Sequence, residues 1–301
     1  MEYKKISVII PTCDRPLELR ECLYSLSKQR YPKDKAEIIV VDDGIKKISS
    51  ICLDEYKELR INYLSQSHKG PAAARNLGIR KSSGDIILFI GDDILAHEDL
   101  LKSHNEFHCL HMQKNKGVLG HITWSDKIKI THFMRWLEKS GVQFDFLSLK
   151  DNMKTDFLHF YTSNISVKSS FLKEKKIFFN ENFKFAAYED IEFGFKLERE
   201  GFELYYISKA KAFHMHKIET LSYAKRMFKA GRSARLLEKV INKKMGKECG
   251  FFMILYKIYK AFFYYMAVFI IENRIYSEKI FAGFTENFYA LGYLTGKEKN
   301  E

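Results

Sequence analysis

Two adjacent carboxylates, Asp92 and Asp93, follow an apolar run of the sequence at residues 86–90. Neighbouring carboxylates repel each other and resist ionising together unless a cation or a hydrogen-bond donor stabilises them. Mg²⁺ and Mn²⁺ prefer hard oxygen ligands and the phosphate groups that these ions carry. A polar turn is the ordinary origin of an Asp-Asp pair, but this pair also predicts a site for a divalent cation.

Polar or acidic pairs also end two earlier apolar runs, namely Pro11-Thr12 and Asp42-Asp43. Runs that are apolar on both faces and separated by helices indicate a parallel sheet covered on both sides. The ligands of such sheets bind beyond the carboxyl ends of the strands. We therefore expect an anionic cleft that takes a cation together with its ligand.

Periodicity predicts an α/β fold. We expect strands at residues 6–11, 36–44, 59–66, 85–93, 117–124, 157–172 and 203–216. We expect helices at residues 17–29, 71–82, 131–141, 188–201 and 221–244, the fourth ending at Gly201.

The charge of the chain is uneven. The 301 residues contain 50 basic and 38 acidic side chains, a net charge of +12. The segment from Leu221 to the end has 15 basic and 7 acidic residues, so 15 − 7 = 8 of the excess positive charges lie there. This predicts an anionic partner, either membrane lipid or nucleic acid, for a basic and aromatic-rich helical region at residues 221–301, distinct from a domain at residues 1–220 that contains the acidic cleft.

Residues 250–271 contain nine aromatic side chains among 22. Lys257 and Lys260 interrupt the segment, and its longest uninterrupted apolar piece, residues 261–271, is too short to span a bilayer. Such a helix is either buried against the rest of the protein or lies in the interface of an anionic membrane.

Five cysteines, at positions 13, 22, 52, 109 and 249, are scattered without a CxxC pair. They are typical of reduced thiols in a cytosolic protein. The apolar run before Pro11 is too short for a signal peptide. We therefore expect a cytoplasmic protein that lies peripherally on the inner face of the plasma membrane.

A series of motifs, in order, resembles glycosyltransferase family 2: VIIPTCDRP, LYSLSKQRYP, EIIVVDDG, GPAAARNLGI, GDIILFIGDD, YEDIEFGFKL and AFHMH. The resemblance covers residues 5–235. It implies the GT-A fold, a Rossmann-like mixed and mainly parallel sheet flanked by helices, here with a C-terminal helical extension. It also implies inverting transfer of a sugar from a nucleotide-sugar donor to a glycan or lipid-linked acceptor, in bacterial-type surface polysaccharide assembly.

The same resemblance implies a nucleotide-sugar site. Pro11 and Thr12 would line the nucleotide pocket, and Asp43 would contact the base. Asp92 would lie near the ribose. Arg75 is expected either to reach the diphosphate or to pair with Asp43 or Asp92.

The resemblance implies a metal site as well. Asp93 would bind Mn²⁺ or Mg²⁺, although Gly91 stands where the first Asp of the family's DxD motif is common. His214 or His216 would complete the site, and we favour His214 because it directly follows the last aromatic residue of the strand. The ion would neutralise the charge that develops on the departing nucleoside diphosphate.

Asp190 matches the general base of the family. An acceptor hydroxyl must lose its proton as it attacks the anomeric carbon, and one positioned carboxylate is enough for this step. The neighbouring Glu189 is expected to orient the base, to contact the acceptor, or to cap the helix.

Two other functions fit less well. Sugar-nucleotide-synthesising nucleotidyltransferases carry a glycine-rich loop after the first strand, and the corresponding segment PTCDRPLE has no glycine. A nucleic-acid-binding protein would suit the charge, but the charge lies away from the acidic cleft and no base-reading motif is present, so we expect no nucleic-acid partner.

His104 and His108 have a spacing usable for zinc, although a solvated helix face is the expected explanation.

Overall fold

The computed structural model describes residues 2–45, 55–242, 257–266 and 277–295. Its strands are β1 (Ile6–Thr12), β2 (Ala36–Asp42), β3 (Ile61–Ser65), β4 (Ile86–Ile90), β5 (Ile94–Ala96), β6 (Lys116–Trp124), β7 (Lys154–Thr155), β8 (Asn164–Lys168) and β9 (Glu203–His214). Its helices are α1 (Pro16–Ser27), α3 (Pro71–Lys81), α4 (Leu100–Leu110), α5 (His132–Ser140), α6 (Ser169–Lys175), α7 (Glu189–Arg199), α8 (Thr220–Ile241) and α10 (Glu278–Thr295), with a further helical stretch at residues 257–266.

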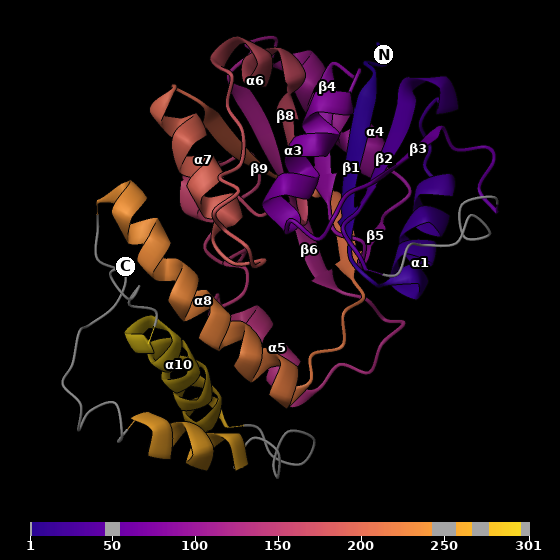
Figure 1. Cartoon of the computed structure of the whole chain (residues 1–301). Helices are drawn as coiled ribbons and strands as arrows, with labels where there is room; N and C mark the ends of the chain where they lie inside the picture. Colours follow the sequence, from indigo (N-terminus) through magenta and orange to yellow (C-terminus); the bar gives the residue numbers. More distant parts are fainter. Residues whose placement is uncertain (1, 46–54, 243–256, 267–276, 296–301) are drawn as a thin grey trace.

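All described strands belong to one mixed sheet, in the order β3-β2-β1-β4-β8-β6-β9-β5, with β7 paired to β9. Strands β3, β2, β1 and β4 are parallel. Strand β8 is antiparallel to β4 and β6, whereas β9 runs parallel to β6. The predicted α/β architecture is confirmed, and the sheet occupies the upper part of the molecule with α8 and α10 below it (Figure 1).

The register of the sheet brings the chemically active residues to one edge. Thr12 pairs with Asp42 across β1 and β2, and β4 ends beside them. His214, at the end of β9, pairs with Ile94 of β5, which follows the Asp92-Asp93 pair directly. Loops from both halves of the sheet therefore meet beyond the same strand ends.

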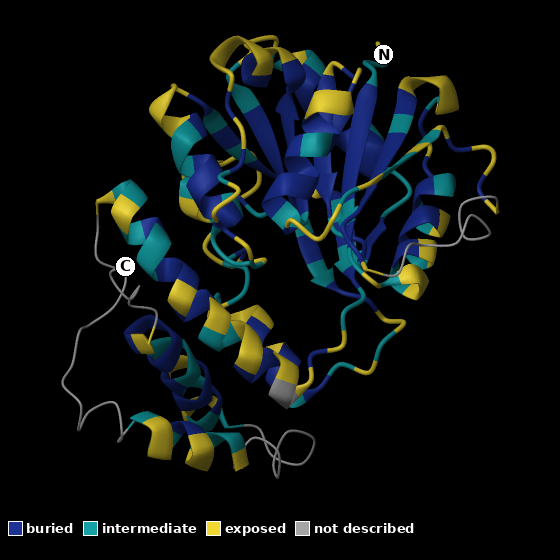
Figure 2. Cartoon of the chain, viewed as in Figure 1, coloured by how far each residue is buried: buried dark blue, intermediate teal, exposed yellow. Residues whose placement is uncertain are grey.

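Apolar side chains bury both faces of the sheet. The strands are almost entirely buried in Figure 2, and every residue of β4 is at most 1% exposed. Helix α3 packs on β1 and β2, and α4 packs on β9 and β6. Gly78 permits the close approach of α3, because a Cβ there would lie 2.5 Å from a methyl carbon of Ile9.

Three parts of the fold differ from the sequence prediction. The strand expected at residues 157–172 is limited to β8, preceded by a 3-10 turn at Phe157–His159 and continued by α6. The short strands β5 and β7 were not predicted, whereas α10 lies within the helical region expected at residues 221–301, for which no bounds were predicted. Strand β5 has three residues, so no periodicity could reveal it.

His104 and His108 are buried, so the expected solvated helix face is wrong. His104 is hydrogen-bonded through Nδ1 to Ser166 Oγ at 2.8 Å and through Nε2 to Asn164 Oδ1 at 2.9 Å. His108 Nε2 shares the same hydroxyl at 2.8 Å. Burial lowers the pKa of His104 to about 4. The two imidazoles are polar links between α4 and β8.

The C-terminal helices share a core with α5. Phe281 and Phe284 of α10 contact Phe133 of α5, with ring centroids 5.2 and 5.8 Å apart. Helices α8 and α10 cross at two glycines: a Cβ at Gly231 or Gly292 would collide with the backbone of the partner helix. Among the described residues, no helix is long and apolar enough to cross a bilayer.

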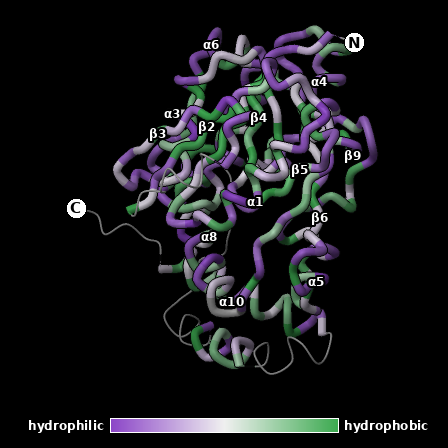
Figure 3. Tube along the Cα trace, turned by 90° about the vertical axis from the view of Figure 1, so that its right-hand side faces the viewer, coloured by the Kyte–Doolittle hydropathy of each residue, from purple (hydrophilic) through white to green (hydrophobic). Residues whose placement is uncertain are grey.

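The helical stretch 257–266 forms the lowest part of the molecule, and Figure 3 shows it carrying hydrophobic segments far from the sheet. Its large exposed apolar side chains are Ile258, Tyr259, Phe262, Phe263 and Met266. The remainder of the predicted aromatic segment, 250–256 and 267–271, lies outside the described residues, as do Cys52, Cys249 and the basic residues 243, 244 and 247. The three described cysteines are Cys13, Cys22 and Cys109, and they are not joined to one another.

Candidate active site

Five side chains at the strand ends form a carboxylate cluster, which consists of Thr12, Arg15, Asp92, Asp93 and His214. Arg15 Nη1 donates to Asp92 Oδ1 at 2.8 Å and to Asp93 Oδ2 at 3.0 Å. Thr12 Oγ1 donates to Asp92 Oδ2 at 2.8 Å. His214 Nε2 lies 3.2 Å from Asp93 Oδ2. The expected juxtaposition of Thr12, the Asp pair and His214 is therefore present.

The two carboxylates of this cluster differ in pKa. Burial, together with the charge of Asp93, raises the pKa of Asp92 to about 7. Burial acts in the same direction on Asp93, but the charge and hydrogen bond of His214 and the charge of Arg15 hold the pKa of Asp93 below its usual range. Asp93 is therefore the carboxylate that keeps its negative charge at neutral pH.

His214 and His216 occupy different positions around Asp93. His214 is buried and stacks on Trp124, with ring centroids 5.3 Å apart and an interplanar angle of 12°. The side chain of His216 is 40% exposed, and its Nδ1 lies 3.9 Å from Asp93 Oδ2 and 3.2 Å from Arg15 Nη2. His214 makes the shorter approach to Asp93, which agrees with our preference for it, although the metal ligand itself stays a prediction.

Asp43 holds the loop that precedes α3. Its carboxylate accepts hydrogen bonds from the backbone N of Lys69 at 2.6 Å, from Gln66 Nε2 at 2.7 Å and from the backbone N of Gly70 at 2.8 Å. A carboxylate offers about four acceptor positions, so roughly one remains for a ligand. Pro11 lies close to this carboxylate, because Pro11 of β1 pairs with Val41 and Thr12 pairs with Asp42.

Arg75 forms its ion pair with Glu189, so the expected pairing with Asp43 or Asp92 is wrong. Arg75 Nη1 lies 2.9 Å from Glu189 Oε1, and both side chains are at least nine-tenths buried. The guanidinium carbon of Arg75 also lies 5.5 Å from the ring centroid of Phe179. The pair joins α3 to the first turn of α7, which is where the predicted base is located.

Asp190 occupies the first turn of α7 and is half-buried. The backbone N of Ile191 donates to Asp190 Oδ1 at 2.9 Å. Burial and the charge of Glu189 raise the pKa of Asp190 to about 7, against an opposing effect of Arg75. A carboxylate with this pKa can accept a proton from a hydroxyl near neutral pH.

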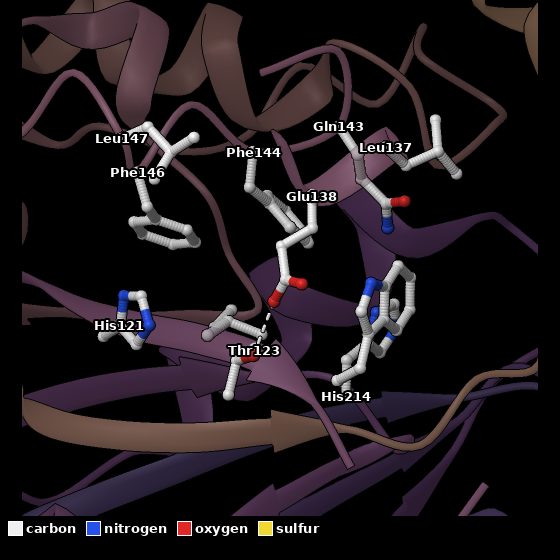
Figure 4. Close-up of a pocket in the computed structure, with 11 residues that line it drawn as sticks. His121, Thr123, Leu137, Glu138, Gln143, Phe144, Phe146, Leu147 and His214 are labelled. Atoms are coloured by element: carbon white, nitrogen blue, oxygen red, sulfur yellow. Dashed lines mark hydrogen bonds between the residues drawn. The ribbon is translucent and has the colours of Figure 1, made fainter. Parts of the chain in front are cut away.

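A pocket opens beside His214, between β6, α5 and the loop that follows α5 (Figure 4). Its volume is about 200 Å³. Residues 121–124 of β6, residues 137–138 of α5, the loop residues 143, 144, 146 and 147, and His214 line it. We call it the aromatic pocket, because Trp124, Phe144 and Phe146 form much of its wall.

Arg15 is the site residue that the sequence analysis missed. It follows Thr12 by three residues, in the loop after β1, and loops at the carboxyl ends of parallel strands meet at one edge. That position was sufficient to place a basic side chain beside Asp92 and Asp93. No pattern in the sequence could indicate the partners of Asp43 at residues 66–70, because two of these partners are backbone N–H groups.

A mixed α/β sheet with carboxylates gathered beyond its strand ends fits a GT-A-type protein. The model of "Glycosyl transferase family 2" matches residues 7–162, just over half of the chain. The chain therefore belongs to glycosyl transferase family 2.

Two curated relatives show the range of similarity. Glycosyltransferase AglE of Haloferax volcanii is 38% identical over 101 residues, which are 32% of this chain and 33% of AglE. The poly(ribitol-phosphate) beta-N-acetylglucosaminyltransferase TarS of Staphylococcus aureus is 32% identical over 124 residues, 38% of this chain and 22% of TarS. The matches thus span a third or less of these relatives' own length.

Solved structures show the same fold. The mannosyltransferase PcManGT from Pyrobaculum calidifontis, in complex with GDP-Man and Mn²⁺, superposes with a TM-score of 0.60 at 17% identity, over 82% of this chain and 66% of PcManGT. TarS 1–349 superposes with a TM-score of 0.58 at 18% identity, over 94% of this chain and 80% of that one. The predicted GT-A fold is confirmed.

The Arg75–Glu189 pair allows a test of the base-bearing turn. Arg75→Met is expected to lower the free energy of unfolding by about 3–5 kcal/mol, because it leaves a buried carboxylate unpaired. Arg75→Met with Glu189→Leu should recover a large part of that loss, as measured by urea denaturation. Arg20→Met, which breaks the exposed pair with Glu55, is the control and should cost about 0–1 kcal/mol. A double variant no more stable than Arg75→Met would contradict this account of the pair.

Proposed function

We propose that this protein is an inverting glycosyltransferase that moves a sugar from a nucleotide-sugar donor to a glycan or lipid-linked acceptor in surface polysaccharide assembly. The observation that carries the proposal is the carboxylate cluster at the strand ends, with the half-buried Asp190 on a neighbouring helix. Family membership supports it, as do relatives whose names describe sugar transfer onto poly(ribitol-phosphate).

A divalent ion, Mn²⁺ or Mg²⁺, fits the donor chemistry of the cluster, since carboxylate oxygen and imidazole nitrogen both bind such metals. Asp93 and His214 would hold it, with His216 as the alternative ligand. The guanidinium of Arg15 now lies among these groups, and within the described part of the chain no three His, Cys, Asp or Glu side chains are arranged to hold a metal ion. When bound, the ion would neutralise charge on the departing diphosphate.

The other side chains of the site have complementary tasks in this proposal. Thr12 and Asp92 would contact the nucleoside, with Asp43 beside the base. Asp190 would accept the proton of the attacking hydroxyl at its carboxylate, while the backbone N of Ile191 keeps that carboxylate oriented. Glu189 holds Arg75 and keeps the first turn of α7 in place.

Donor binding tests the proposal. With Mn²⁺ present, one member of a panel of UDP-, GDP-, dTDP- and CMP-sugars should raise the melting temperature, because a ligand at 100 times its dissociation constant stabilises by about 2.7 kcal/mol. Asp93→Asn should abolish the shift and sugar transfer while the variant remains folded by circular dichroism. If no nucleotide sugar stabilises the folded wild-type protein, the proposed function fails.

Asp190→Asn should reduce turnover by orders of magnitude while donor affinity stays within a few-fold, because the loss concerns the transition state. The wild-type kcat/KM should rise with pH and level off above about 7, since the base works only when ionised and the pKa of Asp190 is raised to about 7. Steady-state kinetics across pH and calorimetric donor titration measure the two effects. A variant that loses donor binding but transfers bound sugar normally would contradict the assignment.

Arg15→Gln should raise the affinity of the nucleotide-free protein for Mn²⁺ about tenfold, or about 1.4 kcal/mol, because the guanidinium and the ion compete for Asp93. Electron paramagnetic resonance of unbound Mn²⁺ measures this directly. Arg20→Gln, on the exposed side of α1, is the matched control and should leave the affinity unchanged. An unchanged or weaker affinity in Arg15→Gln would show that Arg15 does not occupy the cation position.

We further propose that the C-terminal helices contact an anionic membrane. The exposed apolar face of residues 257–266 supports this, with Tyr259 and Phe262 each about two-thirds exposed. Lys225 and Lys229 of α8 line an apolar groove together with Phe262, so positive charge and exposed aromatic surface lie side by side. Such basic residues contribute about 1 kcal/mol each near an anionic leaflet.

Liposome flotation tests the membrane proposal. The protein should float with anionic vesicles at low salt, less so at high salt, and not with neutral vesicles, because screening weakens the attraction. Phe262→Ser with Phe263→Ser should abolish flotation. Leu17→Ser removes an equally exposed apolar side chain from α1 and should have no effect. Equal flotation of the wild type and the double variant would refute this proposal.

A further inference from the structure

The aromatic pocket shares a wall with the carboxylate cluster. Nε2 of His214 faces Asp93 at 3.2 Å, and the same imidazole lines the pocket. The pocket is built on β6 and α5, in the half of the sheet opposite to β2 and its Asp43. It therefore adjoins the expected reaction centre from the side away from the expected nucleotide base.

The rings around the pocket hold one another in place. The Phe144 ring contacts His214 and Tyr161, with centroids 6.2 and 5.0 Å apart, and Phe146 contacts Tyr161 at 5.7 Å. Trp124 is fixed on the other side by the hydrogen bond of its Nε1 to the backbone O of Met134 at 3.0 Å. The wall thus presents aromatic rings that contact one another, which suits a ligand with an apolar face.

Gln143 is a polar group of this wall that has no hydrogen-bond partner among the described residues. Figure 4 shows its carboxamide directed into the pocket, on the side of His214. Both Nε2 and Oε1 are shielded from solvent and have no hydrogen-bond partner in the described structure. A buried amide without partners is unfavourable, so the position indicates a ligand that both donates and accepts hydrogen bonds.

Glu138 adds an acceptor at the same pocket. Its Oε1 accepts a hydrogen bond from Thr123 Oγ1 at 2.5 Å, which orients the carboxylate and leaves its other oxygen available to a ligand hydroxyl (Figure 4). An acyl chain would satisfy the aromatic rings but leave Gln143 unpartnered. A pyranose ring satisfies both, because its C–H face packs on aromatic rings and its hydroxyls donate and accept.

We propose that the aromatic pocket binds a pyranose ring of the acceptor, with Gln143 and Glu138 as the residues that recognise its hydroxyls. The inference rests on the proposed transferase function and deepens it, since it names the acceptor group as a sugar ring instead of a bare lipid phosphate. A hydroxyl of this ring would attack the anomeric carbon of the donor, with Asp190 accepting its proton and the nucleoside diphosphate departing.

Tryptophan fluorescence can observe this pocket selectively. The chain has two tryptophans, and Trp136→Phe leaves Trp124 as the single reporter in the pocket wall. The probes are the methyl β-pyranosides of glucose, galactose, mannose and N-acetylglucosamine, with glycerol as a polyol that has no ring. At least one pyranoside should change the emission saturably with millimolar affinity, and glycerol should not.

Gln143→Ala should weaken that pyranoside at least tenfold without lowering the melting temperature, because it removes an amide that has no partner. Gln113→Ala, on an exposed surface position, is the matched control and should bind like the parent. Saturation-transfer NMR on the chain with both tryptophans provides a readout that does not depend on Trp136→Phe folding. If none of the pyranosides binds, or if Gln143→Ala binds as well as Gln113→Ala, the proposal is overturned.

Donor binding separates the two proposals. Nucleotide-sugar stabilisation without pyranoside binding would overturn the sugar subsite and leave the transferase function standing. Pyranoside binding without any nucleotide-sugar stabilisation would instead overturn the transferase function, and with it the acceptor role of the pocket.

Discussion

The repulsion between Asp92 and Asp93 is the constraint on which this site depends. Two carboxylates at the end of one buried strand require positive charge or hydrogen-bond donors within reach. Arg15 comes from the loop after β1, Thr12 from β1 itself and His214 from the end of β9. The side chains that offset the charge of Asp92 and Asp93 thus come from strands and loops that are far apart in the sequence and meet at one edge of the sheet.

The second acidic pair is stabilised in a different way. Asp42 accepts a hydrogen bond from the backbone N of Gly44 at 2.8 Å, and Asp43 from those of Lys69 and Gly70 at 2.6 and 2.8 Å. Backbone donors cannot leave without unfolding their loops, whereas the guanidinium of Arg15 can rotate away. The proposed metal ion therefore concerns the Asp92-Asp93 pair, whose present cation is a side chain.

The sequence predicted most of the sheet, because β1, β2 and β4 are buried on both faces and read as continuous apolar runs. It also predicted which strand ends would meet. It did not predict partners: Arg75 was expected to pair with Asp43 or Asp92 or to reach a diphosphate, and the structure pairs it with Glu189 of α7. His104 and His108 were expected in solvent, yet their spacing from Leu100 and Leu101 places them on the buried face of α4. The C-terminal region was predicted to be helical, but the bounds of α10 were not, and its contact with α5 depends on packing between segments far apart in the sequence.

The glycine crossing of α8 and α10 affects how the C-terminal helices would behave at a lipid surface. Helices held together mainly by exclusion of water from apolar side chains lose that driving force in hydrocarbon. Helices in direct backbone contact at small residues retain their packing there, which is why such contacts are frequent between transmembrane helices. With Gly231 and Gly292 at the crossing, the contact between α8 and α10 rests on direct backbone packing as well as on burial of apolar side chains, so the proposed approach to a lipid surface would not by itself remove what holds this pair together.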